Sequence, residues 1–347
     1  MTTTAPTMPA AVFADIGKLE LVERPVPRLR RPGDVLLDVQ SSGICGTDLH
    51  ILSTPPGFEA TPGTVLGHEF VGVVREAGAE VMSLAPGDRV VVAPNVSCGQ
   101  CSSCRRGLRN HCENFTTHGV FIDGGLAPHV VVPASQCFPI GHHVPNHVAA
   151  LAEPLSTVVN GAKLAQVFPG ETVVVLGGGP IGQLYTALLQ LAGCQVITVE
   201  PTEERRQLAT TMGADRVVDP RQEDLAASIR DATAGLGADV IIDAVGSQLP
   251  NALDVVRKAG RIVLFGMNDQ ARAEIAQVRI TRDELQLLGG FVGQDTLVFP
   301  PATRLLEQGR LNLEPLITHQ IQLKELPAAV EELRAGRATK VEVVGFD

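Results

Sequence analysis

The chain has 347 residues, of which 44% are hydrophobic, and it contains 35 glycines and 24 prolines. This length predicts about two domains, and this composition predicts a turn-rich globular protein and excludes a disordered chain. The formal net charge of −10 argues against binding to nucleic acid, because such binding needs a basic surface that displaces counterions.

The N-terminal segment lacks the basic and apolar regions of a secretion signal. No later run of about 20 apolar residues is free of charges, glycine or proline. We therefore expect a cytoplasmic protein that binds no membrane. In such a reducing compartment, clustered cysteines favour metal-bound thiolates over disulfides.

The first part of the chain, from Val12 to about Pro154, contains short apolar runs that are separated by turn residues. Examples are DVLLDVQSSG, VLGHEFVGVVREAG and GDRVVVAP. Runs with a period of two, bounded by glycine and proline, are typical of strands. This part is therefore predicted to form a mainly β domain.

From Thr172 to about Val292 the pattern changes to strands that alternate with helices. TVVVLG is followed by the apolar-periodic IGQLYTALLQLAG, QVITVE by EERRQLATTMGA, and ADVIIDAV by LPNALDVVRKAG. This alternation predicts an α/β domain with a doubly wound parallel sheet. The closing helix AAVEELRAG and the strand KVEVVGF are expected to rejoin the first domain.

A glycine-rich turn follows the first strand of this second region. In VVVLGGGPIGQ, the spacing G-x-G-x-x-G opens a helix, and Pro180 and Ile181 lie inside the motif. Gly177 permits the tight turn, Gly179 the approach of a pyrophosphate, and Gly182 close packing of the helix, whose N-terminus faces the anion. The turn therefore predicts a dinucleotide site.

Glu200 ends the next strand, where a carboxylate binds the ribose 2′-hydroxyl and repels a 2′-phosphate, which favours NAD over NADP. Arg205 and Arg206 complicate this expectation, because a nearby arginine can accept a 2′-phosphate. The ends of later strands are expected to line the nicotinamide pocket. The residues concerned are Val245, Phe265, Gly266, Met267, Phe291 and Val292.

Four of the seven cysteines lie in the segment CGQCSSCRRGLRNHC. The spacing C-x2-C-x2-C-x7-C supplies four thiolates for a tetrahedral zinc ion, and four protein ligands leave no open position for substrate. We therefore expect a structural zinc site in a lobe of about residues 95–115. Its ligands would be Cys98, Cys101, Cys104 and Cys112.

The candidates for catalysis lie elsewhere. SSGICGTDLH contains Cys45, VLGHEFVG contains His68 and Glu69, and LAEPLST contains Glu153. A catalytic zinc ion usually has three protein ligands and an open position, and Cys, His and a carboxylate form a suitable set. Neighbouring strand residues point to opposite faces, so His68 and Glu69 can share a metal only if the backbone turns there. Otherwise Glu153 is the third ligand. The sequence leaves open which of the two carboxylates, Glu69 or Glu153, binds the metal.

In their order along the chain, GICGTDLH, GHEFVG, the four-cysteine segment, EPLS and VLGGGPIG resemble the zinc-dependent medium-chain dehydrogenase/reductase family, which includes alcohol, sorbitol and threonine dehydrogenases. The resemblance implies a GroES-like catalytic domain over residues 1–157 and 298–347 and a Rossmann domain over residues 158–297. It also implies two zinc ions per subunit, one catalytic and one structural, and a homodimer or homotetramer.

The resemblance implies a hydride transfer from the alcohol carbon to the nicotinamide. Zinc would act as a Lewis acid that lowers the pKa of the substrate hydroxyl. Thr47 would take the hydroxyl proton and pass it through the cofactor ribose to His50. Asp48 would orient the metal-bound imidazole through its second nitrogen.

The substrate is defined less sharply than the chemistry. EPLS is similar to polyol dehydrogenases, but their Arg–aromatic pair after the last Rossmann strand is replaced here by GGFVGQD. We expect oxidation of a secondary alcohol of a polyol, sugar, cyclitol or related hydroxy compound to a ketone. The alternative within the family is an L-threonine or amino-alcohol dehydrogenase.

Two alternatives belong to other classes. A zinc-lobe interaction protein without catalysis would hold one zinc ion per chain and would not reduce NAD. A zinc-free quinone reductase would lack Cys45, His68 and the four-cysteine segment, and its NADPH-dependent turnover would survive chelation. Counting zinc ions and testing NAD reduction distinguish both from a zinc-dependent dehydrogenase.

Overall fold

The computed structural model describes residues 6–347, which fold into two compact units. Unit 1 comprises the chain up to Ser156 together with Gln294–Gly309 and Ile317–Asp347, and unit 2 comprises Thr157–Gly293 and Arg310–Leu316. The family resemblance implies boundaries at 158 and 298, and the contacts within the chain group residues 310–316 with the second unit.

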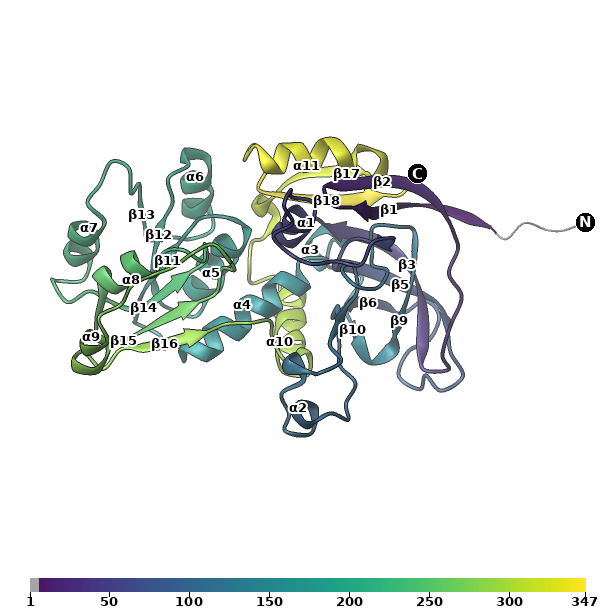
Figure 1. Ribbon diagram of the computed structural model, residues 1–347, viewed down its shortest axis with the longest axis horizontal. Helices are drawn as coiled ribbons and strands as arrows, with labels where there is room; N and C mark the ends of the chain where they lie inside the picture. Colours follow the sequence, from purple (N-terminus) through teal and green to yellow (C-terminus); the bar gives the residue numbers. More distant parts are fainter. Residues whose placement is uncertain (1–5) are drawn as a thin grey trace, which may run out of the picture. The chain divides into compact units, whose positions relative to one another are not determined.

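Unit 1 is built mainly of β-strands (Figure 1). Among the described residues, its larger sheet has seven strands in the order β10-β6-β5-β3-β18-β17, with β9 also paired to β3. Two smaller sheets have the orders β2-β1-β4 and β7-β8. The strands are β1 (Thr7–Asp15), β2 (Lys18–Pro25), β3 (Asp34–Gly43), β4 (Thr64–Val65), β5 (Glu69–Ala77), β6 (Arg89–Val92), β7 (Asn95–Val96), β8 (Thr116–Thr117), β9 (His129–Pro133), β10 (Cys137–Pro139), β17 (Ile317–Gln322) and β18 (Lys340–Gly345).

The pattern of burial explains why these segments form strands. In β9, Val130 and Val132 are buried, whereas His129 and Val131 are half-buried, which is the alternation of a strand with one core face. The closing segment lies in unit 1, where β18 pairs with β3 and β17. The helices of unit 1 are α1 (Gly46–Ile51), α2 (Ser102–Arg105), α3 (Asn146–Ala149), α10 (Asp295–Glu307) and α11 (Leu326–Arg334), and α4 (Ala152–Ala165) continues into unit 2.

Unit 2 is a parallel sheet with helices between its strands. The strand order is β13-β12-β11-β14-β15-β16, and each of these neighbouring pairs is parallel. The strands are β11 (Thr172–Leu176), β12 (Gln195–Val199), β13 (Arg216–Val218), β14 (Ala238–Asp243), β15 (Val256–Leu264) and β16 (Gln286–Gly289). The helices are α5 (Pro180–Leu191), α6 (Glu203–Thr211), α7 (Leu225–Ala232), α8 (Leu249–Val255) and α9 (Gln277–Arg282).

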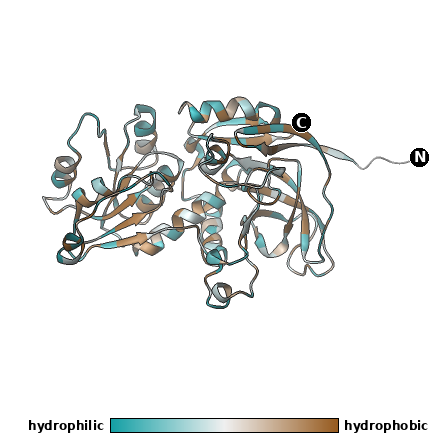
Figure 2. Cartoon of the chain, in the orientation of Figure 1, coloured by the Kyte–Doolittle hydropathy of each residue, from teal (hydrophilic) through white to brown (hydrophobic). Residues whose placement is uncertain are grey.

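This strand order is that of the Rossmann fold, so the predicted α/β class is confirmed. The central strands β11 and β14 are rich in Val and Ile and are mainly hydrophobic (Figure 2), although β14 also contains Asp239 and Asp243. The order of strands reverses between β11 and β14, and ligands of such sheets bind at that point, beyond the carboxyl ends of the strands. No helix within residues 6–347 is long and apolar enough to cross a membrane.

Tyr185 in α5 packs against Gly161 in α4. A Cβ atom at Gly161 would lie 1.7 Å from the Tyr185 hydroxyl. The ring of Tyr185 is fully buried and meets Phe265 edge to face, with centroids 5.2 Å apart. Among the described residues, the hydroxyl has no hydrogen-bond partner. This contact leaves no room for a larger residue at position 161.

The substitution Gly161→Ala is expected to lower the free energy of unfolding by about 1–3 kcal/mol, because an added methyl group overpacks the contact. Tyr185→Phe should be neutral or stabilising, since it removes a buried hydroxyl without a partner. The double variant should recover part of the loss. Urea unfolding measures all three, and a double variant that is no more stable than Gly161→Ala would argue against the contact.

Candidate active site and metal centres

The turn after β3 presents the residues of the GICGTDLH motif. Cys45 is the N-cap of α1, and its backbone N–H donates to Asp48 Oδ2 at 2.8 Å. The Thr47 hydroxyl oxygen lies 3.6 Å from the Cys45 sulfur. Thr47 and His50 are three residues apart on this helix, so they share one face. Thr47 is half-buried and His50 is exposed.

His68 precedes strand β5, which begins only at Glu69. Gly67 has a φ of +89°, and a Cβ atom there would come within 2.7 Å of Ser42 Oγ and Leu126 Cγ. Because the backbone turns at Gly67, the alternation of a regular strand does not separate His68 from Glu69. The ligand atoms of Cys45, His68 and Glu69 lie within 4.8 Å of one another. Of the two possibilities left open by the sequence, the structure has the turned backbone.

The environment of His68 contains two more carboxylates. Its Nδ1 lies 3.8 Å from Asp48 Oδ1, and both atoms are buried without a hydrogen-bond partner within the described part of the chain. Glu153, in the first turn of α4, is buried too. Burial raises the pKa of Glu153 to about 7, with His68 opposing and Glu69 reinforcing the shift. Glu153 therefore lies near His68 but outside the group that Cys45, His68 and Glu69 form.

A buried charged network behind Glu69 is absent from the sequence-based prediction. The Lys340 ammonium group contacts the Glu69 carboxylate and donates to the Ile44 carbonyl oxygen at 3.0 Å. Glu342 accepts a hydrogen bond of 2.9 Å from the Ser41 hydroxyl. Burial lowers the pKa of Lys340, but Glu69 and Glu342 raise it overall, and burial raises the pKa of Glu342 to about 8. One sequence signal exists: two charged residues alternate with valines in KVEVV.

The donor set of this cluster suits a zinc ion. Burial, reinforced by Glu69, raises the pKa of the Cys45 thiol, so the thiolate needs a nearby cation. Sulfur, imidazole and carboxylate are the ligand types that zinc takes, and a metal ion reverses the pKa shift of a coordinating thiol. His68 Nδ1 and Asp48 Oδ1 are the buried atoms described above that have no hydrogen-bond partner among the described residues. They lie side by side, as a carboxylate lies beside a metal-bound imidazole.

The four cysteines of the second candidate site also converge. The sulfur atoms of Cys98, Cys101, Cys104 and Cys112 lie within 4.8 Å of one another, and no disulfide joins them. Backbone N–H groups surround them, including those of Cys98 and Asn114, each 3.3 Å from the Cys112 sulfur. The Gln100 N–H, followed by that of Cys101, lowers the pKa of the Cys98 thiol to about 6. A four-thiolate set of this kind fits a closed zinc site.

The lobe itself has more regular structure than its sequence suggests. Helix α2 begins immediately after Cys101, whose sulfur accepts from the Cys104 N–H at 3.5 Å. Three more residues, Arg109–His111, form a 3₁₀ turn before Cys112. These short turns bring the four cysteine side chains together. The sequence of the lobe has no apolar repeat from which the turns could be predicted.

The glycine-rich turn lies between β11 and α5. Gly177 has a φ of +102°, and a Cβ atom at Gly182 would lie 1.9 Å from the Gly177 carbonyl oxygen. Gly179 caps α5, and a Cβ atom there would meet nothing within 4 Å. Pro180 is the first residue of the helix and Ile181 the second. The turn thus leaves open space at the N-terminus of α5, where an anion can bind.

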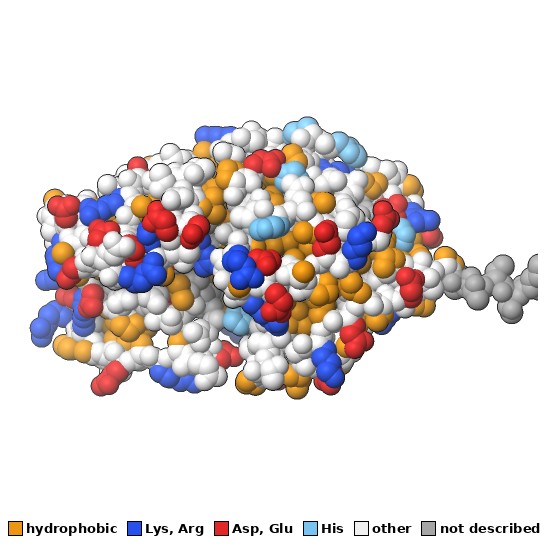
Figure 3. All heavy atoms as spheres, turned by 90° about the horizontal axis from the view of Figure 1, so that it is seen from above, with side chains coloured by type: hydrophobic (Ala, Val, Ile, Leu, Met, Phe, Trp, Pro, Cys, Tyr) orange, Lys and Arg blue, Asp and Glu red, His pale blue; other side chains and the backbone are white. Residues whose placement is uncertain are grey.

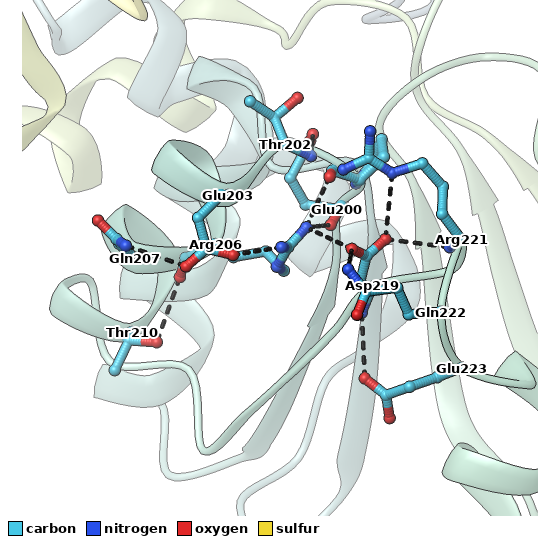
Figure 4. Close-up of polar contacts among 11 residues, drawn as sticks. Glu200, Thr202, Glu203, Arg206, Gln207, Thr210, Asp219, Arg221, Gln222 and Glu223 are labelled. Atoms are coloured by element: carbon cyan, nitrogen blue, oxygen red, sulfur yellow. Dashed lines mark hydrogen bonds and ion pairs between the residues drawn. The ribbon is translucent and has the colours of Figure 1, made fainter.

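The carboxylate of Glu200 is held by backbone donors. Its Oε2 accepts from the Gly178 N–H at 2.7 Å and its Oε1 from the Thr202 N–H at 2.8 Å. Arg206 is engaged with the Glu203 carboxylate, with the Glu200 carbonyl oxygen at 3.0 Å and with Asp219 Oδ2 at 3.1 Å (Figure 4). Arg205 Nε has no hydrogen-bond partner within residues 6–347. Of the two arginines considered for a 2′-phosphate, Arg206 is therefore already paired.

The residues expected at the nicotinamide pocket have different environments. The side chain of Val245 lies 2.6 Å from an ideal Cβ at Gly177, next to the glycine-rich turn. Met267, which follows Gly266, and Phe291 are more than 40% exposed. The ring of Phe265 packs on Tyr185, and the carbonyl oxygen of Val292 accepts from Asn160 Nδ2 at 3.0 Å.

Two family models match the chain. The model described as the alcohol dehydrogenase GroES-like domain matches residues 31–142, and the model described as zinc-binding dehydrogenase matches residues 180–308. A crystal structure of a protein from Sinorhizobium meliloti 1021, bound to NADP, is 34% identical. It superposes with a TM-score of 0.92 over 98% of this chain and 99% of its own.

Curated relatives cover nearly the full length. An L-threonine 3-dehydrogenase of Pyrococcus horikoshii is 36% identical over 329 residues, which are 93% of this chain and 94% of the relative. A D-xylulose reductase A of Aspergillus oryzae is 32% identical over 347 residues, which are 97% and 96% of the two chains. The chain therefore belongs to the zinc-dependent medium-chain alcohol dehydrogenase family and is an oxidoreductase that acts on CH–OH groups.

Proposed function

We propose that the enzyme transfers hydride to NAD from a secondary alcohol of a polyol, sugar, cyclitol or related hydroxy compound, giving a ketone. The observation that carries this proposal is the convergence of Cys45, His68 and Glu69 beside a helix that presents Thr47 and His50. L-threonine or another amino alcohol is the second candidate substrate. It is favoured by the 36% identity to a threonine dehydrogenase, against 32% to a xylulose reductase.

The proposal includes two zinc ions per chain. Cys45, His68 and Glu69 would hold the catalytic ion, with Glu153 as a nearby carboxylate, and the four cysteines of the lobe would hold the structural ion. Zinc supplies a Lewis acid that lowers the pKa of the substrate hydroxyl. Glu69 can serve as a ligand through one oxygen while Lys340 binds the other. Asp48 would keep the imidazole of His68 in the orientation that presents Nε2 to the metal.

A screen of substrates with NAD tests the function directly. Polyols, cyclitols, sugars and amino alcohols are supplied to the zinc-loaded enzyme, and NADH formation is followed by absorbance. We expect one class of secondary alcohol to be oxidised, with loss of turnover on chelation. Turnover confined to amino alcohols would replace the main proposal by its alternative, and the absence of any NAD reduction would contradict both.

Thr47 is proposed to receive the hydroxyl proton and pass it through the cofactor ribose to His50. Thr47→Ala should therefore lower kcat by about 10²-fold or more, since general acid–base steps contribute on that scale. Zinc content should stay unchanged, because the Thr47 oxygen is not among the proposed ligands. Thr47→Ser keeps the hydroxyl and should retain most activity. Equal losses in the two variants would show that the hydroxyl does not carry the proton.

The preference for NAD is proposed to rest on the carboxylate of Glu200. Glu200→Ala should lower the ratio of kcat/KM with NAD to kcat/KM with NADP by about tenfold. This change corresponds to losing roughly 1.4 kcal/mol of repulsion between the carboxylate and a 2′-phosphate. KM for both cofactors should rise, because the Gly178 N–H loses its acceptor. Glu204→Ala, which removes an exposed acid from the following helix α6, is the control. An unchanged ratio in Glu200→Ala would remove the basis for NAD preference.

Three accompanying expectations concern partners and location. A cytoplasmic enzyme that binds neither membrane nor nucleic acid fits the net charge of −10. On the face seen in Figure 3, basic and acidic side chains are interspersed and no basic stripe is present. A homodimer or homotetramer is proposed from the family, and sedimentation of the purified protein measures it.

A further inference from the structure

We propose that unit 1 carries a second binding site, for a small organic anion that also bears an N–H or O–H donor. The site is a cavity of about 260 Å³ between β2, β9 and the turn of residues 118–124. This volume is near the lower end of the range for small-molecule sites. Its apolar walls, which include Met8, Val26 and Ile122, favour an organic body over a bare inorganic ion.

Two arginines at the cavity share one carboxylate. Arg24 NH2 lies 3.8 Å and Arg30 NH2 lies 4.0 Å from Asp123 Oδ2, which are ion-pair distances beyond a hydrogen bond. The other oxygen of Asp123 accepts from the Val65 N–H at 3.0 Å. The side chains of Arg24, Arg30 and Asp123 carry one net positive charge, and Asp34 lies near enough to act on His118. Arg24 Nη1 also donates to the Gly63 carbonyl oxygen at 3.1 Å, so Arg30, which is 69% exposed, has more of its N–H donors left for a ligand. Guanidinium groups bind carboxylate and phosphate oxygens in this way.

His118 supplies the complementary acceptor. Its Nδ1 lies 2.8 Å from the Asp123 carbonyl oxygen, and since a carbonyl can only accept, Nδ1 carries the hydrogen. Burial lowers the pKa of His118, which keeps the ring neutral. Nε2 is then a lone-pair acceptor, and it is buried without a partner among the described residues. His118 is 4% exposed and lines the cavity. The hydrogen-bond donor of the proposed ligand is assigned to this Nε2 atom.

The cavity wall is joined to the segment that delivers His68. The Gly124 N–H donates to the Val65 carbonyl oxygen and the Gly125 N–H to that of Gly67, both at 2.8 Å. A Cβ atom at Gly124 would lie 2.1 Å from the Gly67 carbonyl oxygen, so the two backbones are in close contact. Binding in the cavity is therefore expected to slow amide exchange across residues 64–68. This links the site to the metal centre without placing the ligand there.

The test uses N-acetylglycine and levulinate, which differ only in an N–H group replaced by CH₂ and neither of which is an alcohol. Each is titrated by calorimetry into the full zinc-loaded chain without dinucleotide. We expect N-acetylglycine to bind about fivefold more tightly, the effect of one hydrogen bond of about 1 kcal/mol. Inorganic phosphate is expected to bind more weakly than N-acetylglycine. Equal or tighter phosphate binding would overturn the requirement for an organic body.

Two variants locate the binding. Arg30→Gln should weaken the binding of both compounds by about tenfold. Arg28 is an exposed arginine that does not line the cavity, so Arg28→Gln should leave the binding unchanged. His118→Phe should remove the preference for N-acetylglycine over levulinate. Equal effects of the two arginine variants, or no binding by the wild-type chain, would overturn the proposal. Because Arg30 and His118 lie outside the cluster of Cys45, His68 and Glu69, the effects of these variants distinguish binding in the cavity from binding at the proposed catalytic centre.

Discussion

Replacing Cys45 by alanine is expected to remove one of the two proposed zinc ions and to lower turnover by at least about 10³-fold, because a Lewis acid contributes several kcal/mol to such a reaction. Cys45 is one of three converging donors, and its thiol is otherwise in an environment that raises its pKa. A thiolate there would therefore depend on the proposed zinc ion, and the binding of that ion would depend on the thiolate.

Elemental analysis of the purified variant measures the zinc content, and NADH formation measures the turnover. Cys194→Ala is the control, since Cys194 is a buried cysteine that belongs to neither group of converging donors. The control should retain two zinc ions per chain and its activity. A Cys45→Ala variant that kept two zinc ions would contradict the assignment of this cluster as the catalytic site.

The parts of this molecule whose structure depends on neighbouring residues in the chain could be predicted from the sequence. Strands of β-branched residues followed by amphipathic helices predict the parallel sheet of unit 2, and its strand order confirms the prediction. Two of the three glycines after β11 are local as well, because Gly177 adopts a φ of +102° and Gly182 meets a steric need within the same turn, whereas a Cβ atom at Gly179 would meet nothing within 4 Å. The position of Gly182 against the Gly177 carbonyl oxygen shows this need directly.

The network behind Glu69 could not be predicted in the same way. Lys340 and Glu69 are 271 residues apart and meet only because β18 pairs with β3, which also pairs with β5. That pairing depends on the whole sheet of unit 1. Isolated charged residues in a terminal strand are usually exposed, and only the fold shows that Lys340 is 2% exposed and Glu342 is fully buried.

The two carboxylates left open by the sequence differ in a way that only geometry could resolve. The turn at Gly67 brings Glu69 into the group of Cys45 and His68, whereas Glu153 approaches His68 from α4. We therefore expect Glu69→Gln to weaken zinc binding more than Glu153→Gln does. This ordering follows from the positions of the carboxylates, since both residues are buried glutamates.

The second large effect is expected from a substitution in the four-cysteine lobe. Cys112→Ala should leave one zinc ion per chain and lower the midpoint of thermal unfolding by roughly 5–10 °C, because structural zinc binding contributes directly to folding. Cys112 is buried, and its sulfur accepts from the backbone N–H groups of Cys98 and Asn114. Losing it would therefore remove a proposed zinc ligand and two backbone contacts together.

Cys137→Ala is the control for the lobe variant, since Cys137 is equally buried in β10 but lies outside both groups of donors. It should retain both zinc ions and lose only the packing of one sulfur atom. The remaining zinc ion in Cys112→Ala should be the catalytic one, so the folded fraction should still oxidise substrate. Complete loss of turnover in folded, one-zinc protein would show that the four-cysteine site takes part in the reaction, because a closed structural site has no position for substrate.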